Sequence, residues 1–342
     1  MGSFAFVIHP LNPKQDVARK YPLLAKALPT PLIHLFSRFW PPVYLSHITG
    51  VRSGMMNREI EGWLLACPLT ARQMLRLPPR EVYRKIIQTG RMAQNLGAGI
   101  LGLGAFTSGV GDGGATVARH LDLPVTTGHS LTVALVVEVL EEAARYTGVP
   151  LEASVAAVVG ATGSIGSACA RLLAPLVAKI VLVGRPGSDV AGSRLAEVEA
   201  QVRDAGANVV RLSTRIQDVR RAHVVLSATN AAVPVIQPEY LGRDAVVCDV
   251  ARPPDVSPRV ARERGDVLVV EGGVVDVPGE ADFGFDFGLP PGKAYACMAE
   301  VMVLALEERY ESYSLGKNVR VERVHEIARL ARKHGFRLSA IC

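Results

Sequence analysis

A short apolar run that ends in regularly spaced glycines constrains the fold of this chain more than any other feature. Residues 155–159 are Val-Ala-Ala-Val-Val, and three glycines follow at intervals of three residues. Glycines at this spacing let the backbone turn from a strand into a helix close to a pyrophosphate, which the helix N-terminus stabilises. The spacing is G-x-x-G-x-x-G rather than the commoner G-x-G-x-x-G. The segment predicts a dinucleotide site at Gly160, Thr162, Gly163, Ser164, Ile165 and Gly166.

From residue 155 onward, short β-branched runs alternate with helical segments. This alternation is typical of a parallel sheet with helices on both faces. We therefore predict an α/β fold with a central Rossmann-like, doubly wound parallel sheet. Its strands are expected at residues 155–160, 179–184, 208–212, 223–228, 244–250 and 267–270.

The residues that follow two further expected strands are candidates for contacts with the cofactor. Arg185 follows the second expected strand, where an NAD-dependent enzyme commonly places an acidic residue against the ribose hydroxyls. An arginine there can pair with a 2′-phosphate, which favours NADPH over NADH, although Arg185 as a plain surface residue is the alternative. Ala228 and Thr229 follow the fourth strand, at the edge where the nicotinamide half of such cofactors lies.

Cys297 is the candidate catalytic nucleophile. It follows a Pro-Pro-Gly break at residues 290–292 and lies near the start of a helix expected at residues 295–310. At such a position the helix dipole, together with Lys293, would lower the pKa of the thiol. A thiolate there could attack a thioester or an aldehyde. The alternative is a buried, unreactive cysteine on the core face of the helix.

The part of the chain before residue 125 is Pro-rich and is expected to be irregular, with a strand pair within residues 48–60 and a helix at 81–96. Residues 97–114 are rich in glycine, which indicates either a close backbone approach or a flexible turn. The Thr-Thr-Gly-His-Ser segment at 126–130 precedes an expected apolar helix. Free N–H groups at such a helix start could hold a substrate carbonyl.

Composition and length narrow the class of protein. The chain has 342 residues, of which 49% are hydrophobic and 20% are charged, and this describes a globular protein of about two domains. Its five cysteines are scattered without a C-x-x-C pair, which predicts free thiols and no zinc site. We find no secretory signal and no uninterrupted apolar span, so we expect a cytoplasmic protein without an integral membrane segment.

The net charge of +6 favours an acidic partner, although the basic residues could also form an ordinary solvated face. The chain has no zinc finger or RNP motif, so we do not expect it to bind nucleic acid. The basic residues concentrate in the N-terminal third, at Arg72, Arg76, Arg80, Arg84, Lys85 and Arg91.

Six motifs in a fixed order give the chain a family resemblance. It resembles the long-chain fatty acyl-ACP reductases of the cyanobacterial type from about residue 95 to the C-terminus, and only loosely before residue 90. The motifs are Gly-Ala-Phe-Thr-Ser (104–108), Thr-Thr-Gly (126–128), Val-Val-Gly-Ala-Thr-Gly-Ser-Ile-Gly-Ser-Ala (158–168), Gly-Gly-Val-Val (272–275), Ala-Cys-Met-Ala-Glu (296–300) and Lys-His-Gly-Phe (333–336).

The resemblance implies three parts. These are an N-terminal α/β substrate and carrier-binding domain at 1–130, a Rossmann NADPH-binding domain at 131–285, and a C-terminal helical segment at 286–342 that carries the catalytic cysteine. It also implies NADPH-dependent reduction of a long-chain acyl-ACP or acyl-CoA thioester to a fatty aldehyde, with Cys297 accepting the acyl group. The acyl carrier protein would be an acidic partner, and a downstream enzyme could consume the aldehyde.

Two departures from the family pattern concern the substrate side. The family has a histidine two positions after the place of His129, and two residues on a helix rotate a side chain by about 200°. His129 therefore either replaces the family histidine at the substrate carbonyl, or is a polar residue at the end of a helix with no catalytic role. Residues 248–256 resemble instead the corresponding loop of glutamyl-tRNA reductases, so the substrate can differ from that of the cyanobacterial enzymes.

Three other functions are compatible with the sequence. A glutamyl-tRNA-reductase-like enzyme would place its nucleophile before the Rossmann domain, where Cys67 is the candidate. A dehydrogenase of the amino-acid or shikimate kind would need no cysteine. A regulator without catalytic activity would bind NADPH and consume none.

Overall fold

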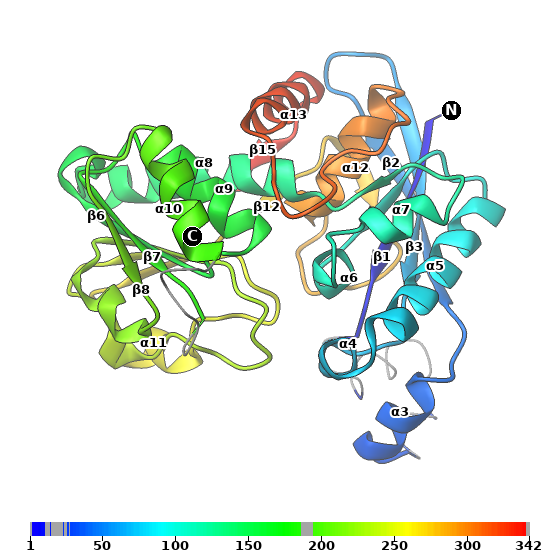
Figure 1. Cartoon of the computed structure of the whole chain (residues 1–342). Coiled ribbons are helices and arrows are strands. Elements are labelled where there is room, and N and C mark those ends of the chain that lie inside the picture. Colours follow the sequence, from blue (N-terminus) through cyan, green and yellow to red (C-terminus); the bar gives the residue numbers. More distant parts are fainter. Residues whose placement is uncertain are drawn as a thin grey trace. The chain divides into compact units, whose positions relative to one another are not determined.

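The computed structural model describes residues 2–10, 14, 23, 26, 28–185 and 194–339. Its internal contacts divide the chain into two compact units, which Figure 1 shows as ribbons. We call the unit that contains Cys297 the cysteine unit; it comprises Met1–Gly128, Val275–Gly316 and Glu326–Arg337. The dinucleotide unit comprises His129–Val274, Lys317–His325 and Leu338–Cys342.

The dinucleotide unit is built on six parallel strands in the order β11-β10-β9-β6-β7-β8. The order runs outward in both directions from the neighbours β6 and β9, as in a doubly wound fold, so the fold prediction is confirmed. Each strand overlaps its predicted range. They are β6 (Val155–Val159), β7 (Lys179–Val183), β8 (Val210–Ser213), β9 (Val224–Ser227), β10 (Val246–Asp249) and β11 (Leu268–Glu271).

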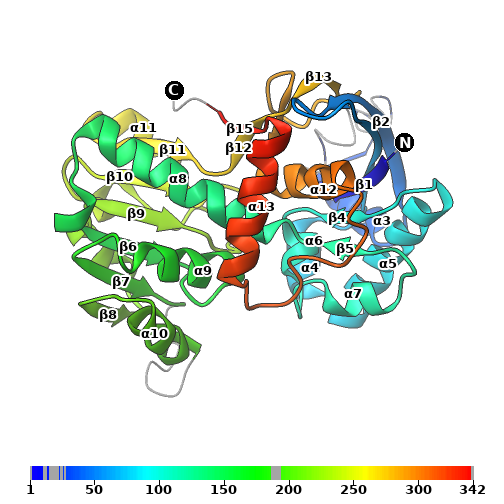
Figure 2. The ribbon, with the colours of Figure 1, turned by 90° about the horizontal axis from the view of Figure 1, so that it is seen from above.

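Buried strands with helices on both faces explain the near-continuous apolar runs. Along β6, Ala156 and Val158 enter one hydrophobic cluster and Ala157 and Val159 enter the other. Helices α8 and α9 lie next to each other on one face, as Figure 2 shows. The helices are α8 (His129–Thr147), α9 (Ser164–Leu173), α10 (Arg194–Asp204) and α11 (Pro258–Glu263), with short 3-10 turns at η1 (Leu151–Ala153), η2 (Ile216–Arg221) and η3 (Pro238–Tyr240).

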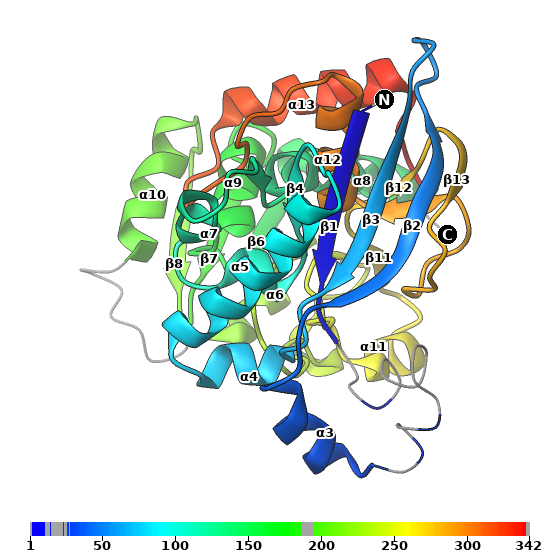
Figure 3. The same ribbon diagram turned by 90° about the vertical axis from the view of Figure 1, so that its right-hand side faces the viewer.

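The cysteine unit has its own six-stranded sheet, in the order β13-β2-β3-β1-β4-β5. The neighbours β3, β1, β4 and β5 are parallel, whereas β2 and β13 add antiparallel strands at one side, which can be followed in Figure 3. The strand pair expected within residues 48–60 is present as β2 and β3, and the helix expected at 81–96 is present as α5 (Pro79–Asn95), but the expectation that the rest of the segment before residue 125 is irregular was wrong. The strands are β1 (Gly2–Ile8), β2 (Val43–Arg52), β3 (Glu59–Ala66), β4 (Leu101–Leu103), β5 (Val125–Thr126) and β13 (Gly279–Asp282).

Helix α12 (Ala296–Leu306) packs on this sheet, where Gly102 makes room for it. A Cβ added at Gly102 would lie 2.5 Å from the Phe6 ring and 3.1 Å from Val301 of α12. Three further strands, β12 (Val274–Asp276), β14 (Lys293–Tyr295) and β15 (Arg337–Leu338), form a small separate sheet. The other helices are α3 (Thr30–Ser37), α4 (Ala71–Arg76), α5 (Pro79–Asn95), α6 (Phe106–Gly109), α7 (Ala115–Arg119) and α13 (Val321–His334), the last of which contributes residues to both units.

Residues 286–342, expected as one helical segment, are shared between the two units. Within the described ranges, no helix has both the length and the apolar character needed to span a membrane.

Candidate functional site

Cys297 is the second residue of α12, directly after the N-cap residue Tyr295 and Ala296. Of the four cysteines that the structure describes, only this one is partly exposed. The N–H groups in the first turn of a helix have no partner within the helix and carry partial positive charge. A thiolate at this position is therefore stabilised by the backbone, which is the setting of many reactive cysteines.

The turn formed by residues 126–128 packs directly against Cys297. Gly128 has a left-handed backbone with φ +71°, and a Cβ added to it would lie 2.2 Å from Cα and 2.4 Å from Cβ of Cys297. Real Cβ atoms do not approach other atoms this closely, so glycine is required twice, for its conformation and for its size. The Thr-Thr-Gly and Ala-Cys-Met-Ala-Glu motifs, far apart in the sequence, thus meet at the candidate nucleophile.

Glu300 holds this turn in place from one helical turn beyond Cys297. It is fully buried and accepts a hydrogen bond of 2.5 Å from the hydroxyl of Thr126. The same hydroxyl accepts the backbone N–H of Gly128 at 3.3 Å. Sequence reasoning gave no role to Glu300 or Thr126, although both lie in the quoted motifs; the signal that was overlooked is a charged residue on an otherwise apolar helix.

His9 is a third buried residue that sequence reasoning missed. It follows β1, is 5% exposed, and its Nε2 accepts the backbone N–H of Phe106 at 3.3 Å, while Nδ1 donates to the carbonyl of Pro10 at 3.1 Å. Burial lowers the pKa of His9 to about 4, so the ring is neutral at pH 7 and keeps its acceptor. His9 thereby holds the turn that starts at Ala105, whose φ of 46° is unusual for a residue with a side chain.

Three loops of the cysteine unit therefore lie at the same edge of its sheet. β1, β4 and β5 are parallel neighbours, and His9, residues 104–108 and residues 127–128 follow their carboxyl ends. The backbone of Gly104 donates to the carbonyl of Val7 at 2.9 Å, which fixes the loops of β1 and β4 side by side.

His129 begins α8, one residue after Gly128, and belongs to the dinucleotide unit. Its side chain is 6% exposed, and burial lowers its pKa to about 4. The imidazole is therefore neutral at pH 7. Such a ring can donate one hydrogen bond but cannot supply the proton of an imidazolium, which narrows the chemistry open to it.

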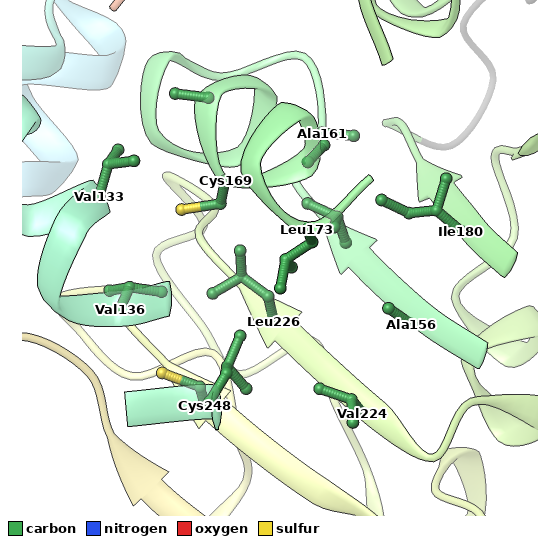
Figure 4. Packing of buried hydrophobic residues seen from close by; sticks show 14 of the residues in the cluster. Val133, Val136, Ala156, Ala161, Cys169, Leu173, Ile180, Val224, Leu226 and Cys248 are labelled. Atoms are coloured by element: carbon green, nitrogen blue, oxygen red, sulfur yellow. The ribbon is translucent and has the colours of Figure 1, made fainter. Parts of the chain in front are cut away.

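Two other residues were candidates for the site, Lys293 as an activator of the thiol and Cys67 as an alternative nucleophile. Lys293 forms an ion pair with Asp276 at 2.5 Å. Cys67 has no exposed surface, and burial raises its pKa to about 11. Figure 4 shows Cys169 and Cys248 packed among aliphatic side chains, and burial likewise raises the pKa of both thiols. None of these three thiols has the exposure that a nucleophile needs.

In the dinucleotide unit, the predicted glycines form a tight passage from β6 to α9. Gly160 has φ +81°, and a Cβ there would lie 2.5 Å from the carbonyl oxygen of Ala228. A Cβ on Gly166 would lie 2.3 Å from the carbonyl oxygen of Gly160. Gly163 is the N-cap of α9 and carries no side chain that would cover the helix start. This arrangement leaves the first N–H groups of α9 open to a pyrophosphate, as a dinucleotide requires. The other predicted contacts are partly exposed: Thr162 lies in the same loop, and Ser164 and Ile165 begin α9.

A buried carboxylate, that of Asp255, fixes the chain where β9 ends. Asp255, which has no exposed surface, accepts hydrogen bonds from the Ser227 hydroxyl at 2.7 Å, the Thr229 hydroxyl at 2.5 Å and the Thr229 N–H at 2.9 Å. The hydroxyl proton of Thr229 is therefore committed to Asp255. Any cofactor contact by Ala228 and Thr229 is left to other atoms, and their binding role stays a prediction.

Arg185 is exposed, two residues beyond the end of β7. The carboxyl ends of parallel strands share one edge, so the glycine loop after β6, Arg185 after β7 and Ala228 after β9 lie along the same side of one sheet. The structure thus brings together the residues predicted to bind the cofactor. It places the predicted nucleophile Cys297 in the other unit.

Comparison with known proteins identifies the fold of the dinucleotide unit. The family model for shikimate / quinate 5-dehydrogenase matches residues 141–271, all within the dinucleotide unit. Together with the strand order and the glycine loop, this match shows that residues 141–271 have a shikimate/quinate-dehydrogenase-like, NAD(P)-binding fold. The prediction that this domain binds a nicotinamide dinucleotide is confirmed.

The similarity to two curated relatives extends beyond that domain. The chain is 33% identical over 278 residues to the aminotransferase PigE of Serratia sp., covering 81% of this chain and 32% of PigE, so it spans about a third of that relative's length. It is 27% identical over 323 residues to the long-chain acyl-[acyl-carrier-protein] reductase of Synechococcus elongatus, covering 89% of this chain and 90% of that protein. Among solved structures, it is similar to quinate dehydrogenase from Corynebacterium glutamicum in complex with NAD, with 15% identity, coverage of 95% and 98%, and a TM-score of 0.40.

Proposed function

We propose that this protein reduces an acyl thioester to an aldehyde with NADPH, by way of an acyl group carried on Cys297. The observation that carries the proposal is the setting of Cys297, a partly exposed thiol in the first turn of α12, against which the Gly128 turn is packed. The similarity to the reductase of Synechococcus elongatus supports a long-chain acyl carrier thioester as the substrate.

The first step is attack of the Cys297 thiolate on the thioester carbonyl. A new carbon–sulfur bond forms, and the electron pair of the carbonyl moves to its oxygen. Backbone N–H groups at the start of α12 are suited to stabilise that oxyanion. The oxyanion then collapses, the bond to the carrier sulfur breaks, and the carrier leaves as a thiol after taking up a proton.

The second step returns the enzyme to its starting state. NADPH, when bound, supplies the hydride that reduces the acyl carbon. The glycine loop at 160–166 would hold its pyrophosphate and Arg185 its 2′-phosphate. Breakdown of the resulting thiohemiacetal releases the aldehyde and restores the Cys297 thiolate. Because the buried His129 ring is neutral, we assign it hydrogen-bond donation to the carbonyl oxygen rather than proton delivery.

The carrier protein is the partner that this proposal requires. Five of the six basic residues noted in the N-terminal third are exposed on α4 and α5, and an acidic carrier would be attracted to them. Lys85 does not belong to this surface, since it is buried and donates to the carbonyl of Trp40 at 2.7 Å. The exposed residues are Arg72, Arg76, Arg80, Arg84 and Arg91.

Intact-mass spectrometry tests the proposal. The purified protein is incubated with a long-chain acyl carrier protein or acyl-CoA without NADPH, beside the Cys297→Ala and Cys67→Ala variants. We expect an added acyl mass on the wild type and on Cys67→Ala, none on Cys297→Ala, and loss of the mass together with aldehyde formation when NADPH is added. The absence of an adduct on all three proteins, with NADPH binding intact, would contradict the acyl-enzyme.

A dehydrogenase that needs no cysteine is the second candidate, because the family model that matches residues 141–271 describes shikimate / quinate 5-dehydrogenase. Such an enzyme would transfer hydride between NADP and the hydroxyl-bearing carbon of a small acid. It would keep its activity in the Cys297→Ala variant. A substrate screen that follows NADPH absorbance with both proteins separates the two candidates.

A further inference from the structure

Two arginines follow neighbouring strands of the dinucleotide sheet at the same level. β7 and β8 are parallel, with Val183 opposite Ser213, and the N–H of Gly184 donates to the carbonyl of Ser213 at 2.8 Å. Arg185 lies two residues beyond Val183, and Arg215 lies two residues beyond Ser213. Both side chains are exposed at the carboxyl edge of the sheet.

The backbone of Arg215 is held in a defined turn. Its N–H donates to the hydroxyl of Ser213 at 3.0 Å, and that hydroxyl donates to Asp218 at 2.6 Å. Asp218 also lies 3.6 Å from the guanidinium of Arg211, so this carboxylate is already engaged. Within residues 28–185 and 194–339, no carboxylate forms an ion pair with Arg215. The turn therefore presents a cation whose charge is not balanced by the described part of the chain.

We propose that Arg215 joins Arg185 in binding the 2′-phosphate of NADPH, and that the pair sets the preference for NADPH over NADH. In a dinucleotide fold the adenosine ribose lies beyond the second strand of the sheet, which is β7 here, and the third strand, β8, lies beside it. A phosphate monoester carries close to two negative charges and several acceptor oxygens, which suits two guanidinium groups rather than one. The inference rests on the proposed use of NADPH, but not on the proposed thioester chemistry.

Equilibrium binding of two nucleotide fragments tests this assignment without any acyl substrate. Adenosine 2′,5′-bisphosphate carries the 2′-phosphate, and 5′-ADP lacks it. Both are titrated against the full chain as wild type, Arg215→Gln and Arg185→Gln. The control is Arg220→Gln, which removes the same charge from an exposed position in η2 of the same unit.

We expect Arg215→Gln to weaken binding of adenosine 2′,5′-bisphosphate about tenfold, a size typical of one lost charge-assisted contact, and to leave 5′-ADP binding unchanged. Arg185→Gln should show the same selectivity, Arg215→Lys should keep part of the affinity, and Arg220→Gln should match the wild type. The kcat/KM ratio of NADPH to NADH should fall in parallel wherever a turnover substrate is at hand.

Three results would overturn the inference. The first is unchanged binding of adenosine 2′,5′-bisphosphate in Arg215→Gln. The second is an equal loss for both fragments, which would place Arg215 in the adenine pocket or in the structure of the turn. The third is a wild type that binds the two fragments equally, which would remove the 2′-phosphate site itself. If the inference holds while thioesters are not reduced, only the proposed reaction fails.

Discussion

The two units assemble their candidate sites in opposite ways. In the dinucleotide unit, one continuous segment at residues 160–166 supplies most of the predicted cofactor contacts. In the cysteine unit, the site is assembled from His9, residues 104–108, residues 126–128 and residues 297–300, which come from four distant parts of the sequence. A dinucleotide is recognised by a local backbone shape, whereas a nucleophile needs neighbours that only the tertiary fold provides.

Glycine makes the comparison concrete. Gly160 and Gly128 have nearly the same left-handed conformation, with φ +81° and φ +71°, and each would clash with a close neighbour if it carried a Cβ. Gly160 meets the carbonyl of Ala228, directly after the adjacent strand β9, and Gly128 meets the backbone of Cys297. A glycine with positive φ at a close contact therefore shapes the predicted cofactor loop in one unit and packs against the candidate nucleophile in the other.

Substitution of Gly128 by alanine gives the largest effect that we expect after loss of the cysteine itself. The new Cβ would be 2.2 Å from Cα of Cys297, so either the turn or the start of α12 must shift. A displacement of about 1 Å at a reacting group lowers turnover roughly 10²-fold. We expect that loss in aldehyde formation, measured with saturating NADPH, together with nearly unchanged NADPH affinity.

Gly148→Ala is the matched control for this variant. Gly148 has φ +72°, but a Cβ there would meet nothing within 4 Å. Its alanine variant pays only the conformational penalty, roughly 1–2 kcal/mol of stability, and should keep full turnover. Equal turnover in Gly128→Ala and Gly148→Ala would show that the contact with Cys297 has no catalytic importance.

Gly166→Ala should produce the reverse pattern in the other unit. Its Cβ would be 2.3 Å from the carbonyl oxygen of Gly160, which forces the pyrophosphate loop open. We expect the dissociation constant for NADPH to rise roughly 30-fold, since the helix N-terminus loses its position. Acylation of Cys297 without NADPH should persist in the mass spectrum. If acylation is lost as well, the two sites are not separable in the way that the comparison suggests.

The contrast between local signals and tertiary contacts also explains which parts of the fold could be predicted from the sequence. The six strands of the dinucleotide sheet were predictable because residues buried on both faces are apolar without interruption, and the glycine spacing is a local signal. In the cysteine unit the strand pair β2–β3 was predicted, but β4 and β5 were missed because they are only three and two residues long and pair with strands far away in sequence. No pattern of single residues marks such pairings.

The residues missed at the site have the same explanation. His9 is a lone histidine after an apolar strand, and its partner Phe106 lies 97 residues away. Glu300 is recognisable only as a charge on an apolar helix, and its partner Thr126 lies 174 residues away. Cys297 was predicted through its motif and helix position, but the packing of Gly128 against it is a tertiary fact.

Two of the buried histidines, His9 in the cysteine unit and His129 in the dinucleotide unit, make stability depend on pH. Burial lowers the pKa of His9 and of His129 from 6.5 to about 4, so the unfolded chain binds more protons than the folded one between these values. Their contribution is complete above about pH 6.5 and is lost as the pH falls toward 4. We expect the free energy of unfolding to drop by about 3 kcal/mol per histidine over this window.

Urea unfolding at pH 7 and pH 5 measures this dependence. In His9→Gln the difference in the free energy of unfolding between pH 7 and pH 5 should be smaller by the contribution of one histidine. The variant should also be less stable at pH 7, because the backbone N–H of Phe106 loses its acceptor. His129→Gln should shrink the difference by a similar share. An unchanged pH dependence in both variants would mean that other groups control acid unfolding.

The smallest effect concerns the exposed arginines of the cysteine unit. Arg80, Arg84 and Arg91 lie within about 40° of one another around α5, and the only acidic residue of that helix, Glu81, pairs with Arg38 at 2.7 Å. An acidic carrier protein would be steered to this face, whereas acyl-CoA would not depend on it. We expect the triple glutamine variant to lower kcat/KM for acyl carrier protein about fivefold at low salt.

Three checks make this last prediction decisive for the comparison. Acyl-CoA reduction in the triple variant should equal that of the wild type, because the chemistry at Cys297 is untouched. Glutamine at three exposed arginines of the dinucleotide unit, Arg220, Arg221 and Arg262, should leave both substrates unaffected. The fivefold loss should also vanish at high salt, since screening removes long-range steering. An equal loss with acyl-CoA would show that the arginines support the fold of the cysteine unit rather than attract a partner.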